Sequence, residues 1–384
     1  MLPRKFLSVG MHSGIKKDSS QKDLGVIFSD QPCKYAAVFT QNSVKAHCVI
    51  DNKNVLLSSP EVNCIVVNSG NANACTGTEG SEAVKHIKNH VAAELNLEVE
   101  NILTASTGVI GRSLDSHLIC SSLQTLKAKF DSSYIDFAES ILTTDTKIKT
   151  YEKELNGCKI VGIAKGSGMI HPDMATMLAF IVTDASIGQD DLQECLNAAN
   201  AKSFNQISVD GDTSTNDMVI LLANGASNEE VNLQEFRDAL NDVCMNLAKQ
   251  IVSDGEGATK LIEVSVRGAQ TEKEAAKIAK GIASSSLVKS AIFGADPNWG
   301  RIVSAAGQNG SVDIEKISLK ILEENLIFKG KVQEVDLIKL SQAIKENNEI
   351  KVELDLEGNT DISTKAWGCD LTYDYVKINA EYTT

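Results

Sequence analysis

Residues 164–186 read AKGSGMIHPDMATMLAFIVTDAS, and this stretch joins a flexible loop to a buried strand. A Gly-Ser-Gly run and a proline lead to Thr176, and the apolar residues 177–182 that follow have the composition of a strand. A hydroxyl at such a junction can attack the carbonyl of the preceding peptide bond and give an ester that water cleaves. The new chain then begins with a threonine whose α-amine serves as its own general base. The alternative interpretation is an ordinary β-branched residue at the start of a core strand.

The composition excludes several classes of protein. The chain has 384 residues, 42% of them hydrophobic, which predicts two lobes or one large layered domain. Its net charge of −14 argues against binding to nucleic acid or to an anionic membrane. Nine scattered cysteines without a C-x-x-C pair favour reduced thiols and a cytoplasmic location. The sequence has neither a secretory apolar region nor an apolar run of about 18 residues, so we expect no membrane span; an organelle address is left open.

Short apolar runs alternate with amphipathic stretches along the chain. Five runs have the length of strands, at residues 36–40, 62–67, 158–164, 177–183 and 219–223. Helical spacing of apolar residues predicts helices at 81–95, 232–253, 271–283 and 335–347, with Ser81 as a cap of the first. Strict alternation in residues 371–376 predicts a strand near the C-terminus. The pattern is typical of an α/β protein with a soft lobe boundary near 260–268.

Seven further blocks follow one another in a fixed order. They are VFTQN (38–42), NSGNANACTG (68–77), TASTGVIG (104–111), LTTDT (142–146), FNQISVDGDTSTND (204–217), DGEGATK (254–260) and AIFGADPNWGRI (291–302). Together with residues 164–186, these blocks resemble the ornithine acetyltransferase (glutamate N-acetyltransferase) family of arginine biosynthesis. The resemblance runs from about residue 10 to the C-terminus, and the number of blocks makes it highly specific.

The resemblance implies a fold and a processing event. The fold is α/β, a layered α/β/β/α-type sandwich of the ornithine acetyltransferase and DmpA-like class, with a smaller C-terminal α/β lobe. We expect the N-terminal lobe at 1–262 and the C-terminal lobe at 263–384. Autoproteolysis between Ala175 and Thr176 would give an alpha chain and a beta chain, which cover 1–175 and 176–384. The two chains are expected to stay together as a heterotetramer of two alpha and two beta chains.

The implied reaction moves acetyl from N2-acetyl-L-ornithine to L-glutamate by a ping-pong mechanism with an acetyl-Thr176 intermediate. No cofactor and no metal are needed, because covalent catalysis divides one transfer into two easier steps. The resemblance leaves open whether acetyl-CoA also serves as the donor. The alternative is a self-processed amidohydrolase or aminopeptidase of similar fold, in which water completes the reaction. A non-catalytic scaffold would have lost its nucleophile, whereas Thr176 is intact.

An acyl-transfer site also needs donors for the tetrahedral oxyanion. Thr107 offers a hydroxyl, and Gly108 offers a backbone N–H that can approach a ligand closely. The family's oxyanion pair corresponds to these two residues. The alternative interpretation is a turn that ends a strand at 102–105.

The resemblance assigns substrate binding to a further set of residues, which are Thr143, Lys165, Thr176, Glu256, Asn379 and Thr384. Lys165 would hold a substrate carboxylate or lower the pKa of the nucleophile. Glu256, between two glycines, would hold the amine of ornithine, whereas without the resemblance it reads as a solvated loop acid. Thr143 is favoured over Thr144 in LTTDT, although the register is open by one residue.

Some features of the sequence carry no assignment. His86 and His90 have helical spacing for a metal but no evident third ligand. The acids of DGDTSTND do not have the spacing of a calcium loop. Asp173 stands where asparagine is expected in many relatives, and its effect on processing is open. The block around Asp296 reads as packing or turn architecture, and whether it lies near the site is open.

Overall fold

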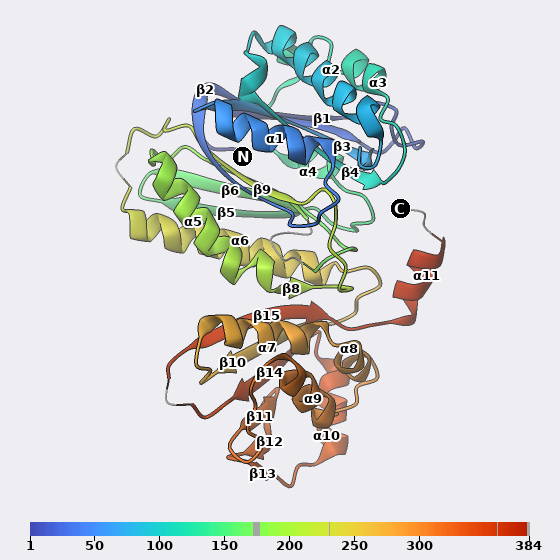
Figure 1. Ribbon diagram of the computed structural model, residues 1–384, viewed down its shortest axis with the longest axis vertical. Coiled ribbons are helices and arrows are strands. Elements are labelled where there is room, and N and C mark those ends of the chain that lie inside the picture. Colours follow the sequence, from blue (N-terminus) through green and yellow to red (C-terminus); the bar gives the residue numbers. More distant parts are fainter. Residues whose placement is uncertain (172–176, 230, 359, 382–384) are drawn as a thin grey trace.

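Two layers of strands lie between two layers of helices in the larger part of the molecule (Figure 1). The structure is a computed structural model that describes residues 1–171, 177–229, 231–358 and 360–381. The first layer contains β1 (Phe6–Met11), β3 (Val62–Asn71) and β4 (Ile102–Val109). The second layer contains β5 (Lys149–Leu155), β6 (Cys158–Lys165), β7 (Leu178–Thr183) and β9 (Met218–Ala223). This arrangement is the layered α/β/β/α sandwich that the sequence predicts.

One long strand, β2 (Leu24–Phe39), belongs to both layers. Its first part pairs with β1 and β3, and its last part, residues 34–39, pairs with β9. The pairing with β3 is interrupted between Phe28 and Cys33, where Pro32 lacks an N–H for a ladder bond. The strand bends at this interruption. The two layers are therefore halves of one hydrogen-bonded sheet that is folded over on itself.

Helices cover the outer face of each layer. The first layer carries α2 (Gly77–Leu95) and α3 (Ser116–Ser122), and the second carries α5 (Gln189–Lys202) and α6 (Leu233–Ser253). The core between the layers also receives side chains from α1 (His47–Ser58) and α4 (Ile135–Ser140). Short 3-10 turns occupy Val99–Asn101, Leu126–Lys129 and Phe204–Gln206.

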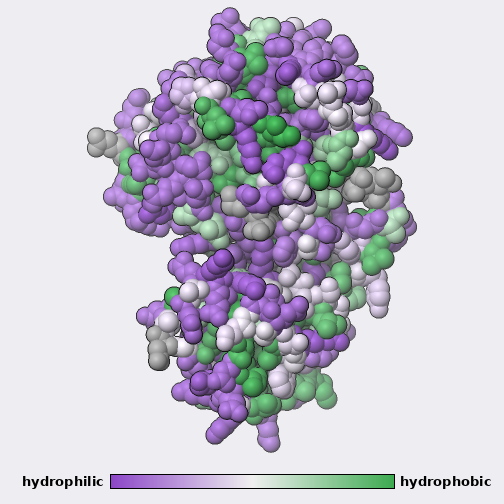
Figure 2. Space-filling view, viewed as in Figure 1, coloured by the Kyte–Doolittle hydropathy of each residue, from purple (hydrophilic) through white to green (hydrophobic). Residues whose placement is uncertain are grey.

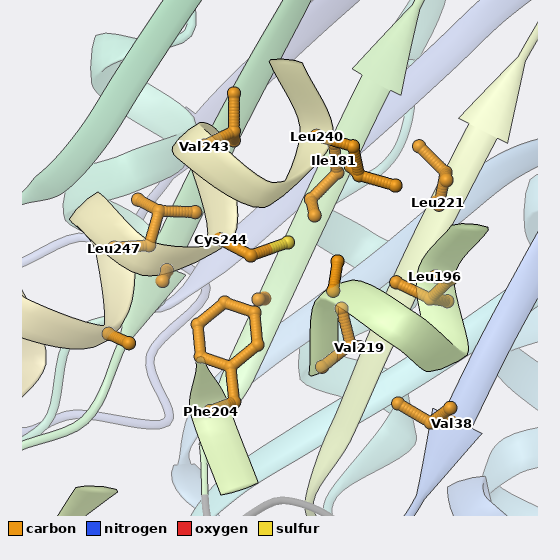
Figure 3. Packing of buried hydrophobic residues seen from close by; sticks show 14 of the residues in the cluster. Val38, Ile181, Leu196, Phe204, Val219, Leu221, Leu240, Val243, Cys244 and Leu247 are labelled. Carbon is orange, nitrogen blue, oxygen red and sulfur yellow. The ribbon is translucent and has the colours of Figure 1, made fainter. Parts of the chain in front are cut away.

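The strand that follows the proposed cleavage site is buried on both faces. Ala179 and Ile181 of β7 pack under α5 and α6. Figure 3 shows Ile181 among the side chains of this core. Leu178, Phe180 and Val182 point the other way, into the core between the layers. A strand covered on both sides reads as a continuous apolar run rather than an alternating one. The predicted strand at 177–183 is thus confirmed, with the observed element starting at Leu178.

A second sheet forms the smaller lobe at the bottom of Figure 1. Its strands are β10 (Leu261–Arg267), β11 (Ser318–Ile321), β12 (Glu324–Phe328), β13 (Lys331–Val332), β14 (Glu349–Asp355) and β15 (Ser363–Cys369). Its core is completed by α7 (Glu272–Ser284), α8 (Ser286–Phe293), α9 (Trp299–Asn309) and α10 (Leu337–Glu346). Alternate residues of β14 are buried and exposed, because helices cover one face only.

The two sheets are tied together by a short strand from the larger lobe. That strand, β8 (Ile207–Ser208), pairs in parallel with Trp367 and Gly368 of β15. The second sheet begins at Leu261, close to the boundary that the sequence predicts. The division into lobes 1–262 and 263–384 stays a prediction, since a strand from the first belongs to the sheet of the second.

The strand predicted at 371–376 is wrong. These residues enter a helix, α11 (Tyr373–Glu381), which stands at the edge of the molecule near the C-terminus (Figure 1). No side chain of the described part of this helix is buried, so the alternation in the sequence does not reflect a buried strand face. Thr372 begins the helix, because its Oγ1 accepts a bond from the N–H of Tyr375 (3.3 Å) and donates to the carbonyl of Gly257 (2.7 Å).

The predicted long helices are confirmed within a few residues of their ends. One correction concerns Ser81, which lies inside α2 rather than at its cap, and whose hydroxyl donates to the carbonyl of Thr78. Among the described residues no helix is long and apolar enough to cross a membrane. The visible surface is mostly hydrophilic, with separate apolar patches (Figure 2).

Candidate active site

A cavity of about 470 Å³ opens at the end of the two strand layers. Six of the predicted site residues line it, namely Thr107, Gly108, Thr143, Lys165, Glu256 and Asn379. Ile170 and Met177 also line it, so the chain reaches this cavity on both sides of residues 172–176. Ala175, Thr176, Asp173 and Thr384 lie outside the described residues.

The close approach of two strands explains the glycine in TASTGVIG. Thr107 and Gly108 lie at the carboxyl end of β4, and Gly108 pairs with Gly70 of β3. Gly108 has a φ of 129°, and a Cβ there would collide with the backbone of Gly70. Only glycine is compatible with this contact. Because β4 extends to Val109, the alternative of a turn after residue 105 is wrong.

Lys165 is the one lysine or arginine among the described residues that line the cavity. It ends β6 and is 8% exposed. Its Nζ donates to Oγ1 of Thr107 (3.2 Å) and to Oγ1 of Thr143 (2.9 Å). Burial lowers the pKa of Lys165, and the carboxylate of Asp145 opposes this effect. The lysine therefore connects the candidate oxyanion residue to LTTDT.

Both threonines of LTTDT face the cavity, with different partners. Thr143 accepts the bond from Lys165, whereas the hydroxyl of Thr144 is 2.8 Å from that of Ser167. Ser167 belongs to the Gly-Ser-Gly loop that follows β6. Thr143 thus lies on the lysine side of the cavity, and Thr144 holds the loop that leads toward the proposed cleavage site.

Glu256 is 8% exposed, so its interpretation as a solvated loop acid is wrong. Its backbone N–H donates to the carbonyl of Ser167 (2.9 Å), and its Oε2 accepts a bond from Nδ2 of Asn379 (2.8 Å). A Cβ on Gly168 would collide with its carboxylate, so a larger residue there would displace the side chain of Glu256. The Glu256–Asn379 bond brings α11 to the cavity, which Tyr375 and Asn379 of this helix line.

Sequence reasoning missed several acidic and polar residues of the cavity wall. Asp210 accepts bonds from the backbone N–H groups of Met169 (2.6 Å) and Ile170 (2.8 Å). It therefore fixes the chain just before residues 172–176. Burial, followed by the charges of Asp210 and Glu256, raises the pKa of Tyr375, which also lines the cavity. The acids of DGDTSTND are visible in the sequence, but their spacing alone does not place them at a cavity.

Asn216 was also missed, and it joins the two strand layers at the cavity. Its Nδ2 donates to the carbonyls of Ala72 (2.6 Å) and Ser106 (2.7 Å) in the first layer. It precedes β9 of the second layer by two residues. No pattern of apolar residues could reveal this link, because the bond joins chain segments more than 100 positions apart.

Two other kinds of chemistry, at a metal ion and at a thiol, concern the histidines, acids and cysteines of the described residues. No group of three or more His, Cys, Asp or Glu there is arranged to hold a metal ion. Burial raises the pKa of Cys33 to about 12 and of Cys48 to about 11, so these thiols stay protonated. The block at 291–302 serves the smaller lobe, where the side chain of Asn298 accepts a bond from the N–H of Arg301 and caps α9. It does not line the cavity.

Comparisons with known proteins agree with the geometry. A model of the ArgJ family matches residues 7–384. The chain is 45% identical over 394 residues to the arginine biosynthesis bifunctional protein ArgJ of Oceanobacillus iheyensis, covering 100% of this chain and 95% of that protein. It is 44% identical over 399 residues to the protein of the same name from Thermotoga neapolitana, with 100% of both covered.

A solved structure is similar to about half of the chain. It is the crystal structure of the arginine biosynthesis bifunctional protein ArgJ from Bacillus halodurans, with 46% sequence identity and a TM-score of 0.52. The match covers 54% of this chain and 100% of the solved one. The similarity in sequence and in structure thus supports the same layered fold.

Proposed function

This chain belongs to the ArgJ family and is an acyltransferase of arginine biosynthesis, and we propose that Thr176 carries an acetyl group from N2-acetyl-L-ornithine to L-glutamate. The observation that supports this role is the position of the chain around Thr176. Ile170 before it and Met177 after it line the same cavity as Thr107, Lys165 and Glu256. A nucleophile at position 176 would face groups that can stabilise an oxyanion and hold a charged substrate.

Maturation would precede transfer. Thr176 Oγ attacks the carbonyl carbon of Ala175, the peptide C–N bond breaks, and an ester joins the two residues. The α-amine of Thr176 is free once the C–N bond has broken and its nitrogen has taken the hydroxyl proton. Water then cleaves the ester, which frees the carboxylate of Ala175 and restores the hydroxyl of Thr176. The resulting chains, 1–175 and 176–384, contribute strands to the same folded sheet, because β6 precedes the cut and β7 follows it. We therefore expect them to remain associated.

Transfer would use the same hydroxyl. The α-amine of Thr176 accepts the hydroxyl proton while Oγ attacks the acetyl carbonyl of acetylornithine. The tetrahedral oxyanion is stabilised by the hydroxyl of Thr107 and the N–H of Gly108. Collapse releases ornithine, whose departing nitrogen takes the proton. Glutamate then enters, and its α-amine attacks the acetyl ester by the reverse sequence.

The charges around the cavity suit the donor. Asp210, Asp212, Asp217 and Glu256 line it and offer carboxylates for the side-chain ammonium of acetylornithine. Glu256 accepts a hydrogen bond from Asn379 of the C-terminal helix. A cavity with this many carboxylates would favour a substrate with an ammonium over acetylated amino acids that lack one.

The single experiment that tests this function is acetyl transfer with purified protein, measured with and without glutamate. A transferase releases ornithine in amounts that follow glutamate, whereas the alternative hydrolase releases it equally in both cases. Replacing acetylornithine by acetyl-CoA in the same assay tests a second activity, which the word bifunctional in the relatives' names suggests. A heterotetramer of two alpha and two beta chains, and a cytoplasmic location, complete the proposal.

Acetylornithine without glutamate should leave an acetyl group on the chain that begins at Thr176. The added mass is about 42 Da, that of an acetyl group replacing a proton in covalent catalysis. Mass spectrometry of the quenched protein detects it, and initial rates plotted against both substrates should give parallel lines. Intersecting lines and no adduct would instead indicate direct transfer in a ternary complex.

Glu256→Gln should raise the KM for acetylornithine by about ten- to a hundredfold. The substitution removes the charge and keeps an oxygen acceptor for Asn379, and a hydrogen bond to a charged group contributes about 1.5–3 kcal/mol. The measurement is the KM for the donor, with Glu349→Gln, at an exposed position of β14, as the matched control. If Glu256→Gln and Glu349→Gln give the same KM, the carboxylate does not hold the ammonium.

A further inference from the structure

Asp145 is a buried carboxylate that lies behind the cavity and has no part in the mechanism above. Its side chain is fully buried and accepts hydrogen bonds from the N–H of Gly166 (2.6 Å), from the N–H of Thr143 (3.0 Å) and from Nζ of Lys149 (2.6 Å). Its Oδ2 is 3.9 Å from Nζ of Lys165. Burial alone would raise the pKa of Asp145, but Lys165 and Lys149 hold it well below its ordinary value. The carboxylate is therefore charged throughout the working range of pH.

We propose that Asp145 is a positioning residue that holds the ammonium of Lys165 on the hydroxyl oxygens of Thr107 and Thr143. The inference rests on the proposed function, in which Thr107 stabilises the oxyanion. Asp145 faces the ammonium directly and also accepts the N–H of Thr143, so one carboxylate fixes both the lysine and one of its two acceptors.

This arrangement has a consequence for the proton of Thr107. An ammonium can only donate, so Oγ1 of Thr107 accepts the bond from Lys165 (3.2 Å). The hydroxyl proton of Thr107 then cannot point at the lysine and is available to the cavity. A neutral Lys165 has a lone pair that can accept from that hydroxyl, and in that arrangement the oxyanion would lose its donor. The protonation state of Lys165 thus decides whether the hydroxyl of Thr107 can donate to the oxyanion.

A chain of buried charges extends from Asp145 to the loop that carries Glu256. Lys149, with 1% of its side chain exposed, bridges Asp145 and Asp254 (2.5 Å). Asp254 also accepts the N–H groups of Thr146 (2.9 Å) and Lys147 (3.3 Å), and it lies two positions before Glu256. Lys165, Asp145, Lys149 and Asp254 thus form a row of alternating charges, and the two positive charges balance the two negative ones.

The charged groups around Lys165 shift its pKa in known directions. Burial lowers the pKa of Lys165; Asp145, Asp217 and Glu256 raise it, whereas Lys149 lowers it. Lys16 is a further positive charge nearby, and its own pKa is lowered by burial and by Lys165. Activity that needs the ammonium is present below this pKa and is lost as the pH rises through it. Removal of Asp145 should move that loss to lower pH, and removal of Lys149 should move it to higher pH.

The test is the dependence of kcat/KM on pH for processed Asp145→Asn and Lys149→Met. The fall at high pH should shift down by about one to three pH units in Asp145→Asn, the usual effect of an opposite charge at this distance, and should shift up in Lys149→Met. Asp242→Asn is the matched control, because Asp242 pairs with Lys153 of the same strand β5 at the surface. Its profile should coincide with that of the parent.

Opposite shifts cannot come from general loosening of the fold, which would lower activity in both variants at every pH. Asp145→Asn should also cost nothing further in a Lys165→Met background, because it acts through the lysine. Unshifted pH profiles would refute the inference. A loss of activity on Asp145→Asn in the Lys165→Met background that is as large as in the parent background would refute it too. If Asp145→Asn does not fold, the sign of the Lys149→Met shift decides alone. A parent without acetyl transfer would refute the proposed function instead.

Discussion

Thr176→Ala is expected to remain a single chain of 41.2 kDa on a denaturing gel and to show no acetyl transfer. The parent should give two bands, of about 19 and about 22 kDa, in proportion to chains 1–175 and 176–384 of the 384 residues. The physical reason is that one hydroxyl serves both reactions. Without it, neither the ester with Ala175 nor the acetyl ester can form.

Thr176→Ser is the matched control, because it keeps the hydroxyl and loses only a methyl group. It should cleave and transfer acetyl, at a changed rate. Melting curves of both variants should resemble that of the parent, since β7 starts at Leu178 and its packing does not depend on the substitution. Two bands of the parent sizes from Thr176→Ala would show that another residue performs the cleavage.

The fold of the larger lobe was predictable because its signals are local. The run after Thr176 is apolar at every position, and the observed β7 is buried on both faces by α6 on one side and the first strand layer on the other. The apolar residues of α6 recur at helical spacing and all enter one core. Burial of a regular face leaves a regular pattern in the sequence, which is what periodicity detects.

The C-terminal helix was not predictable in this way. None of its described side chains is buried, so no apolar face marks it as a helix. Its place depends on contacts with distant parts of the chain, among them the bonds from Thr372 to Gly257 and from Asn379 to Glu256 and the ring contact of Tyr373 with Phe293. The alternation in residues 371–376 then predicted a strand, although these residues enter a helix. The same reason hid Asp145 and Asn216, whose roles depend on partners that only the folded chain brings near.

The candidate site was predictable in part, less fully than the fold of the larger lobe and better than the C-terminal helix. The resemblance assigned residues that the fold gathers around one cavity, although they are spread from Thr107 to Asn379. Spacing alone could not have grouped them, because they come from both strand layers, two loops and the C-terminal helix. What the resemblance did not give is the contact between Lys165 and Thr107, which changes the expected role of the lysine.

Thr107→Ala should lower kcat by about 10²–10³, the usual cost of losing one oxyanion donor, and should change the KM for acetylornithine little. The substitution removes a hydroxyl that acts on the transition state and leaves the carboxylates that would bind the donor in place. Self-cleavage should slow as well, because it passes through its own tetrahedral oxyanion. The measurements are kcat and KM of the processed protein and the rate at which the two bands appear.

The loss should be large but not complete, because the N–H of Gly108 belongs to the backbone and survives the substitution. Thr107→Ser is the control that separates the hydroxyl from the space it fills, and it should retain most of the turnover. Lys165 adds a second prediction about the same bond: in Thr107→Ala its Nζ keeps Thr143 (2.9 Å) as an acceptor, so the lysine should stay in place. A large fall in kcat can then be attributed to the missing donor rather than to a displaced cation. Near-normal turnover of Thr107→Ala would mean that this hydroxyl only holds Lys165.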